Sequence, residues 1–254
     1  MILRTDGIVL QTYRMSESSK IAVLYTAELG KVKVAARGAR KPKSKFGASL
    51  EPFTEGAYVV YHKEGRDIQT LSEGDILRFF EGVKSDFDRL IHASAIVELT
   101  DHVAVGEEPN PILYRALQES LTCLEGLPAD RSETAFWFFQ VHAAEALGYR
   151  PSFDRCAGCG EAFHRKRISF SPRLGGAICE NCGEEGAMTL RDETVQFLHR
   201  LQSSDAGMAA GLDAPEAIRG EVRRALRMFV EYHTEDRRPL RSLHFKDQVS
   251  ATTI

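Results

Sequence analysis

The chain has 254 residues, of which 43% are hydrophobic and 27% are charged. These fractions are those of an ordinary globular protein, and the length allows one large or two to three small domains. No apolar run approaches the roughly 20 residues needed to span a bilayer, and the start, MILRTDGIVLQ, does not have the pattern of a secretory signal. We therefore expect neither membrane insertion nor secretion.

The formal net charge of −3 is unevenly distributed along the chain. Residues 1–80 carry 13 Lys/Arg and 9 Asp/Glu, a net of +4, so the remaining 174 residues have a net of −7. A basic N-terminal part on an acidic body indicates that one end faces a polyanion.

Residues 1–80 have the pattern of short strands separated by turns. The runs are rich in Val, Ile, Tyr and Thr, and they read IVLQTY, KIAVLYTA, KVKVAARG, AYVVYH and DIQTLSEGDIL. Residues 28–30 favour a hairpin between the second and third runs. Five short strands within about eighty residues predict a small antiparallel barrel such as the OB-fold, while an SH3-like or Tudor-like barrel stays open on spacing alone.

A stretch from Lys31 to Lys45 concentrates positive charge. It has no acidic residue, and its basic residues are Lys31, Lys33, Arg37, Arg40, Lys41, Lys43 and Lys45. In the strand part, period-two geometry puts the first three of these on one face and Val32, Val34 and Ala36 on the other. Gly38 and Pro42 mark a loop that projects the remaining cations. The pattern favours phosphate binding over the alternative of a solvated edge strand, because so dense a cluster repels itself.

Aromatic residues of the same region could stack on unpaired bases. They are Tyr13, Tyr25, Phe46, Phe53, Tyr58 and Tyr61. Aromatics at strand spacing usually fill a barrel core, so we expect Phe46 alone to be exposed.

From about Asp86 the hydrophobic period becomes helical. Three helices are predicted, in FDRLIHASAIVELTDHV, ILYRALQESLTCLEGL and SETAFWFFQVHAAEALGY. Asn110-Pro111 opens the second, and Gly148 with Pro151 ends the third. The resulting fold class is α+β, with a barrel domain over 1–82 and a helical domain over 83–254.

Four cysteines in the spacing C-x2-C-x19-C-x2-C follow the third helix, at Cys156, Cys159, Cys179 and Cys182. Two such knuckles can close four thiolates around one tetrahedral Zn²⁺, and a complete sulfur shell leaves no position to activate water. One structural zinc ion is therefore predicted, in an insertion at about 153–186 within the helical domain. The fifth cysteine, Cys123, fits a buried thiol in a helix.

Two further helices are predicted after the insertion, in TLRDETVQFLHRLQ and APEAIRGEVRRALRMFVEYHTE, with a mobile loop at residues 203–215 between them. The last helix carries a second basic set, Arg219, Arg223, Arg224 and Arg227. This set could extend a phosphate track through Arg223, Arg224 and Arg227, but pairing with neighbouring acids on the helix surface is the commoner outcome.

Motifs of enzymes are missing from the sequence, which contains no GxxxxGK[ST], GxGxxG, HExxH or GxSxG. We therefore expect a binding protein rather than an enzyme, with no catalytic residues. A nuclease that uses dispersed carboxylates such as Asp67 and Asp75 is the more distant reading.

Over essentially its whole length the sequence resembles the bacterial recombination mediator family RecO. The resemblance lies in DGIVL, VAARGARKPKSKFGASLEPF, ALGYRPSFDRCAGCG, ISFSPRLGGAICENC and VEYHTEDRRPLRSLHF. It implies an N-terminal OB-fold that binds DNA, with the family's basic barrel positions matching Arg37, Arg40, Lys43 and Lys45 best.

The same resemblance implies a cytoplasmic, nucleoid-associated bacterial protein of recombinational repair. Such a protein binds single- and double-stranded DNA, anneals complementary strands, docks on the acidic C-terminal tail of the single-stranded-DNA-binding protein (SSB), and works with RecR to load RecA. Charge reversal at Arg37 and Arg40 is expected to abolish DNA binding and annealing. The rival reading is a zinc-containing protein–protein adaptor with an SH3-like or Tudor-like barrel and no nucleic-acid role.

Overall fold

The computed structural model describes residues 1–163, 167–183, 185–234 and 238–252. By their mutual contacts, the residues form two compact units, Met1–Leu121 with Leu240–Ile254, and Thr122–Pro239. None of the helices in the described ranges combines the length and the apolar character that crossing a membrane requires.

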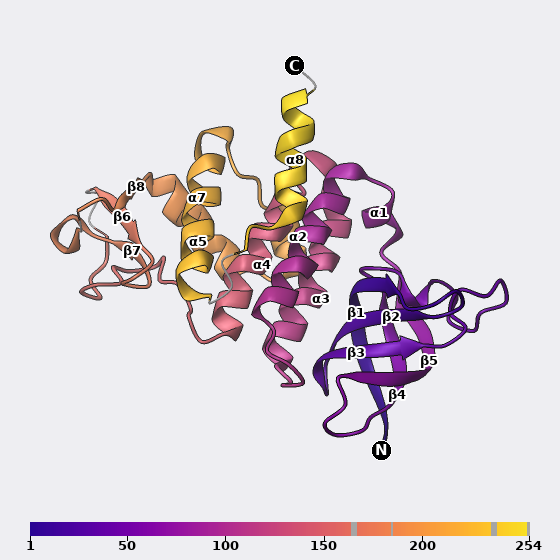
Figure 1. The fold of residues 1–254 in the computed structure, drawn as a ribbon. Helices are drawn as coiled ribbons and strands as arrows, with labels where there is room; N and C mark the ends of the chain where they lie inside the picture. Colours follow the sequence, from indigo (N-terminus) through magenta and orange to yellow (C-terminus); the bar gives the residue numbers. More distant parts are fainter. Residues whose placement is uncertain (164–166, 184, 235–237, 253–254) are drawn as a thin grey trace. The chain divides into compact units, whose positions relative to one another are not determined.

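The first unit begins with a closed five-stranded barrel, drawn from indigo to purple in Figure 1. Its strands are β1 (Ile2–Arg14), β2 (Lys20–Thr26), β3 (Gly30–Ala36), β4 (Glu55–Tyr61) and β5 (Ile68–Arg78). They are ordered β1-β2-β3-β5-β4, and among these strands only β3 and β5 pair in parallel. The OB-fold prediction is confirmed, as is the tight β2–β3 hairpin with Thr26 opposite Gly30.

Alternation along the strands fills the barrel as the sequence predicts. Val32, Val34 and Ala36 on β3 are at most 1% exposed and join one apolar cluster. The other members of that cluster are Val9, Ala22, Leu24, Phe46, Leu50, Tyr58, Val60 and Leu71. Because successive residues of a strand point to opposite faces, Lys31 and Lys33 are directed outward.

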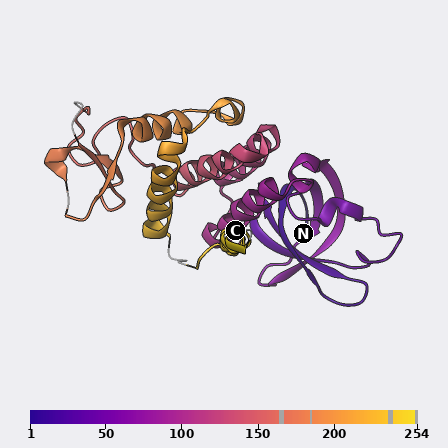
Figure 2. The same cartoon turned by 90° about the horizontal axis from the view of Figure 1, so that it is seen from above.

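Three helices follow the barrel in the first unit: α1 (Glu81–Lys84), α2 (Phe87–Val103) and α3 (Pro111–Gly126), whose last turn crosses into the second unit. The Asp86 side chain caps α2 by accepting a hydrogen bond from the Arg89 N–H at 2.9 Å, and Asn110 caps α3 in the same way. The last helix, α8 (Arg241–Thr252), packs on α2 (Figures 1 and 2), and the Glu98 carboxylate accepts hydrogen bonds from its first N–H groups. Sequence periodicity did not predict α8, because its pattern is too weakly amphipathic.

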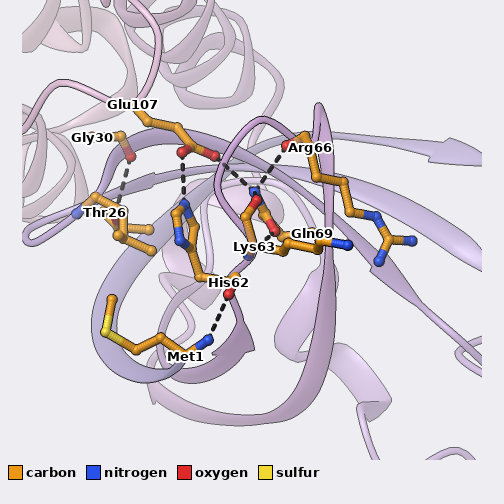
Figure 3. A network of polar contacts seen from close by, with 9 residues as sticks. Met1, Thr26, Gly30, His62, Lys63, Arg66, Gln69 and Glu107 are labelled. Carbon is orange, nitrogen blue, oxygen red and sulfur yellow. Dashed lines mark hydrogen bonds and ion pairs between the residues drawn. The ribbon is translucent and has the colours of Figure 1, made fainter.

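The loop between α2 and α3 is fastened to the barrel (Figure 3). Glu107 accepts hydrogen bonds from His62 at 2.8 Å and from Gln69 at 3.3 Å. The Gly30 turn lies directly against the backbone of Glu108, so that a Cβ added at Gly30 would be 2.3 Å from the Glu108 carbonyl oxygen. Only glycine therefore fits this approach.

Gly30→Ala is expected to destabilise the barrel by about 2–4 kcal/mol, because it adds a clash to the strain of a residue at φ +66°. Gly65→Ala is the matched control, since Gly65 has φ +73° but no atom within 4 Å of an added Cβ. Urea unfolding of both variants measures the difference. Equal loss of stability in the two would show that the contact with the loop contributes nothing.

The second unit contains the helices α4 (Glu133–Ala146), α5 (Asp192–Gln202), α6 (Ala206–Gly211) and α7 (Glu216–His233). Between α4 and α5 lies a sheet of three short strands, ordered β7-β6-β8: β6 (Ile168–Ser171), β7 (Gly176–Ile178) and β8 (Met188–Leu190). The cysteine region is thus an insertion between helices, as predicted.

The predicted mobile loop at 203–215 is wrong in part, because α6 lies inside it. The Asp205 side chain starts this helix by accepting a hydrogen bond from the Met208 N–H at 2.8 Å. Small residues hid the helix from a hydrophobic-period analysis, whereas Ala and a capping Asp are favourable for it.

Candidate metal centre and nucleic-acid interface

Four thiols converge in the insertion of the second unit. The Sγ atoms of Cys156, Cys159, Cys179 and Cys182 all lie within 4.8 Å of one another, and those of Cys159 and Cys179 are 3.8 Å apart. Sulfur ligands at about 2.3 Å from a tetrahedral zinc ion are themselves about 3.8 Å apart. In the part of the chain that the structure describes, this is the one group of three or more such side chains close enough to share a metal ion.

Backbone geometry brings the two knuckles together. The Sγ atom of Cys156 accepts hydrogen bonds from the N–H groups of Gly158 at 3.4 Å and Cys179 at 3.2 Å. A Cβ added at Gly158 would lie 3.0 Å from both Cβ and Sγ of Cys182, so a side chain at this position would push the knuckles apart. The donor set and its spacing therefore fit a closed four-sulfur metal site.

The thiols of Cys156 and Cys182 differ in how readily they ionise. Burial opposes ionisation of Cys156, but backbone hydrogen bonds from Cys179, Cys159 and Gly158 outweigh it and lower the pKa of this thiol to about 6. Hydrogen bonding to Cys159 and the other cysteines raises the pKa of Cys182 to about 12. Four thiolates at this distance repel one another, so a bound cation is what permits all four to lose their protons.

The basic residues predicted to bind DNA separate into two groups in the structure. The first group lies on β3 and is engaged in contacts. The Lys31 ammonium donates to the Asp101 carbonyl oxygen at 2.6 Å and lies 3.4 Å from the Asp101 carboxylate, which joins β3 to α2. Lys33 forms an exposed ion pair with Asp67 at 3.0 Å. Sequence parity could place these two lysines on one face but could not supply their partners.

The second group lies on the long connection between β3 and β4. Its members are exposed, and they are Arg37, Arg40, Lys41, Lys43 and Lys45. The structure records no ion pair between Arg37, Lys41 or Lys43 and any residue that it describes. Lys45 lies over the Phe46 ring, with its Nζ 5.5 Å from the ring centroid. The connection therefore presents a cluster of exposed cations, as the sequence predicts.

Arg40 has a second contact set that the sequence did not reveal. Its guanidinium donates to the carbonyl oxygens of Ser16 at 3.0 Å and Glu17 at 3.1 Å. Its backbone N–H donates to the carbonyl oxygen of Ser18. The β3–β4 connection is thereby held against the β1–β2 loop. Arg40 is a structural link between two loops of the barrel as well as a cation.

The expectation that Phe46 alone would be exposed is wrong. Phe46 is 3% exposed and packs in the barrel core, since the connection folds back over the barrel in a short 3-10 turn at Gly47–Leu50. Tyr25, Phe53 and Tyr58 are also buried. The exposed aromatics are instead Tyr13, at 51%, and Tyr61, at 49%.

The arginines of α7 are mostly paired. Arg223 makes a bidentate pair with the Glu133 carboxylate of α4, at 2.7 and 2.8 Å. Arg227 lies 3.7 Å from Glu231 one turn later, and Arg219 is held by acids near the start of the helix. Arg224 is exposed. The structure therefore shows ion pairing on the helix surface for this set, and not a row of free cations.

Replacing Arg223 by Ala is expected to lower the free energy of unfolding by about 1 kcal/mol, because the pair ties α7 to α4 but Arg223 is largely exposed. Glu133→Gln should cost a similar amount. In the double variant the total loss of unfolding free energy should be smaller than the sum of the two single losses. Chemical denaturation of the original protein, the two single variants and the double variant measures these losses. Fully additive losses would mean that the two side chains do not stabilise each other.

An open pocket of mixed polar and apolar lining lies beside α7. It has a volume of about 500 Å³ and is lined by Pro172, Met228, Glu231 and Tyr232. The aromatic run Phe136–Phe139 of α4, which supplies apolar side chains in the sequence, is buried throughout. The aromatic run of α4 therefore offers no exposed apolar surface, whereas Met208 of α6 and Tyr232 of α7 are more than half exposed.

Comparison with known proteins covers nearly the entire chain. Residues 1–80 match the family described as "Recombination protein O N terminal", and residues 84–244 match "Recombination protein O C terminal". The "DNA repair protein RecO" of Caldanaerobacter subterraneus subsp. tengcongensis is 31% identical over 236 residues, covering 92% of this chain and 93% of the relative.

Two other relatives named "DNA repair protein RecO" agree with this match. That of Symbiobacterium thermophilum is 32% identical over 250 residues, covering 97% of each chain. That of Anaeromyxobacter sp. (strain K) is 33% identical over 252 residues, covering 97% of this chain and 96% of the relative. With an OB-fold barrel, a helical region and a four-cysteine insertion matched from end to end, the chain belongs to the RecO family of recombination proteins.

Proposed function

We propose that this chain binds single- and double-stranded DNA and anneals complementary strands. The observation that carries the proposal is the cluster of exposed cations on the β3–β4 connection of the barrel, in a protein whose family acts in DNA repair and recombination. Neutralising phosphates releases counterions, which makes such binding favourable and strongly dependent on salt.

The proposed mechanism is electrostatic. Two strands that approach each other repel through their phosphates, and this repulsion slows annealing. Cations such as Arg37, Lys41 and Lys43 can neutralise phosphates of both strands and so lower the barrier to pairing. Nothing in this scheme requires bond cleavage, so the proposed role is not enzymatic. Metal-dependent DNA cleavage by the purified protein would contradict it and would revive the nuclease reading with Asp67 and Asp75.

The proposed partners follow from the family. They are RecR, the acidic C-terminal tail of SSB and, indirectly, RecA, in a bacterial cytoplasm at the nucleoid. A tail that is acidic and ends in apolar residues needs a hydrophobic groove with a basic rim.

Zinc is the proposed occupant of the four-cysteine site. Tetrahedral sulfur sites favour zinc or iron–sulfur chemistry, and the single set of four thiols at this spacing suits one zinc ion. The ion would join the two knuckles, and its closed shell would leave it a structural role.

Annealing of SSB-coated complementary strands tests the proposed function. The protein should accelerate duplex formation, and the acceleration should fall when SSB lacks its C-terminal tail. Acceleration that does not depend on the tail would remove the SSB contact from the proposal. A protein that binds no DNA at any salt concentration would instead favour the adaptor reading, although the barrel itself has OB-fold and not SH3-like or Tudor-like topology.

A further inference from the structure

The outer face of the barrel carries a second feature beside the cationic loop. Tyr13 on β1 lies opposite Ile21 on β2, and Ile21 lies opposite Ala35 on β3. Since Ala22, Val34 and Ala36 point into the core, these three neighbours point outward. Together they form an apolar row across three strands, which we call the Tyr13 row.

This outer face is open at Tyr13, whereas Ala35 at the β3 end of the row is only 7% exposed. Toward α2 and α3, Val23 is 4% exposed and Tyr25 is 1% exposed, and Lys31 is bound to Asp101 of α2. At the other end Tyr13 is 51% exposed, and Met15, just beyond the strand, is 52% exposed. Large apolar side chains thus remain open where the sheet emerges from under the helix.

The ring of Tyr13 is held in place. Its hydroxyl donates to the Gln11 side-chain oxygen, two residues back on the same strand, and the Gln11 amide in turn donates to the Asp101 carboxylate at 3.0 Å. The ring is therefore directed along the strand and anchored through Gln11 to α2. An aromatic ring that is already ordered loses little conformational entropy when a ligand stacks on it.

Basic residues lie at the β3 end of the row. Lys33, which is paired with Asp67, lies on the adjacent outward position of β3, and Arg37 follows the end of that strand. Arg40 holds the cationic β3–β4 connection against the loop that follows Tyr13 and Met15. An exposed flat ring on the same barrel face as cations that can neutralise phosphates has the chemistry that recognises an unpaired nucleotide, with the base on the ring and the backbone on the cations.

We propose that Tyr13 is a stacking platform for one unpaired base and that it gives the barrel a preference for single-stranded over double-stranded DNA. The inference rests on the proposed DNA binding and deepens it. Bases within a duplex are stacked on each other and cannot reach the ring, so a duplex gains only the phosphate contacts. A single strand gains both.

Tyr13→Ala tests this with three fluorescent probes at one salt concentration: a dT oligonucleotide, a strand of abasic deoxyribose phosphates of equal length, and a blunt duplex. We expect the variant to bind the dT strand about 5- to 150-fold more weakly than the original protein. Its affinity for the abasic strand and for the duplex should be unchanged, because neither offers a base to the ring.

Two matched variants separate stacking from other effects. Tyr13→Phe keeps the ring and loses the hydroxyl, so it should bind the dT strand within about threefold of the original protein. Tyr61→Ala removes a tyrosine of nearly equal exposure, 49%, that lies opposite Ile2 near the start of β1, and it should bind all three probes normally. Thermal unfolding of each variant shows that the barrel is folded.

The outcomes distinguish the two proposals. Binding of the dT strand by Tyr13→Ala as tight as that of the original protein would overturn the stacking role while leaving DNA binding intact. An equal loss on all three probes, or a Tyr13→Phe variant as weak as Tyr13→Ala, would overturn it as well. Absence of binding to every probe by the original protein would overturn the proposed function itself.

Discussion

Replacing Arg37 and Lys43 by glutamate is expected to weaken binding of single-stranded DNA about 10³-fold at low salt and to stop annealing. Both side chains are exposed on the β3–β4 connection, away from any described ion-pair partner. A cation 4 Å from a phosphate gains about 1 kcal/mol in water, so reversal of its charge costs about 2 kcal/mol. Two such changes cost about 4 kcal/mol, which is about a thousandfold in affinity.

The salt dependence gives an independent measure of the same effect. Loss of two phosphate contacts on a single strand should reduce the slope of log K against log salt by about 1.4. Arg40 is left unchanged in this variant, because it also holds the β1–β2 loop and its replacement would confound binding with structure. For the same reason, charge reversal at both Arg37 and Arg40 would perturb the contact between these two loops in addition to weakening DNA binding.

Lys63→Glu with Arg66→Glu is the matched control. It makes the same change in net charge at exposed positions of the β4–β5 loop. A comparable loss of affinity in this control would mean that the overall charge of the barrel, and not the β3–β4 connection, governs binding. An unaltered slope in the Arg37 and Lys43 variant would remove that connection from the interface.

Cys156→Ser is expected to abolish stoichiometric metal binding and to loosen the segment from Pro151 to Leu190. Cys156 is the buried thiol of the cluster, at 1% exposure, and it accepts hydrogen bonds that join the two knuckles. Structural zinc sites contribute about 10–16 kcal/mol of binding free energy to folding, so much of the order in this segment would depend on the proposed zinc ion. Since altered outer-shell groups alone cost 10- to 100-fold in affinity, loss of a ligand should cost more than about 100-fold.

Metal analysis of the purified protein and limited proteolysis measure these two effects. Cys123→Ala is the control, because Cys123 is buried in α3 and lies outside the cluster. It should keep one metal ion per chain and resist protease like the original protein. DNA affinity should fall little in Cys156→Ser, since the β3–β4 cations lie in the other compact unit. A stable, metal-free Cys156→Ser protein with unchanged proteolysis would refute the structural role.

Much of the fold is readable from local patterns. The strands of the barrel follow from β-branched runs between turns, and α2 begins and ends at the residues of its predicted segment. Helix α8 and the short α6 escaped prediction, because one has a weak hydrophobic period and the other is made of small residues. The start of α8 is held by the carboxylate of Glu98, which belongs to α2. The start of α6 is held by its own capping residue, Asp205.

For the candidate site as well, local sequence patterns predict part of the arrangement and tertiary contacts determine the rest. By itself, the sequence determined the cationic character of residues 31–45, the inward face of β3 and the four-thiol ligand set, because charge, strand parity and cysteine spacing are local properties. Tertiary structure alone decided which cations have partners: Lys31 binds Asp101, 70 residues away, while Lys43 stays exposed. It also decided which aromatic ring is open, burying Phe46 and leaving Tyr13 exposed, since burial depends on which distant segments cover a strand.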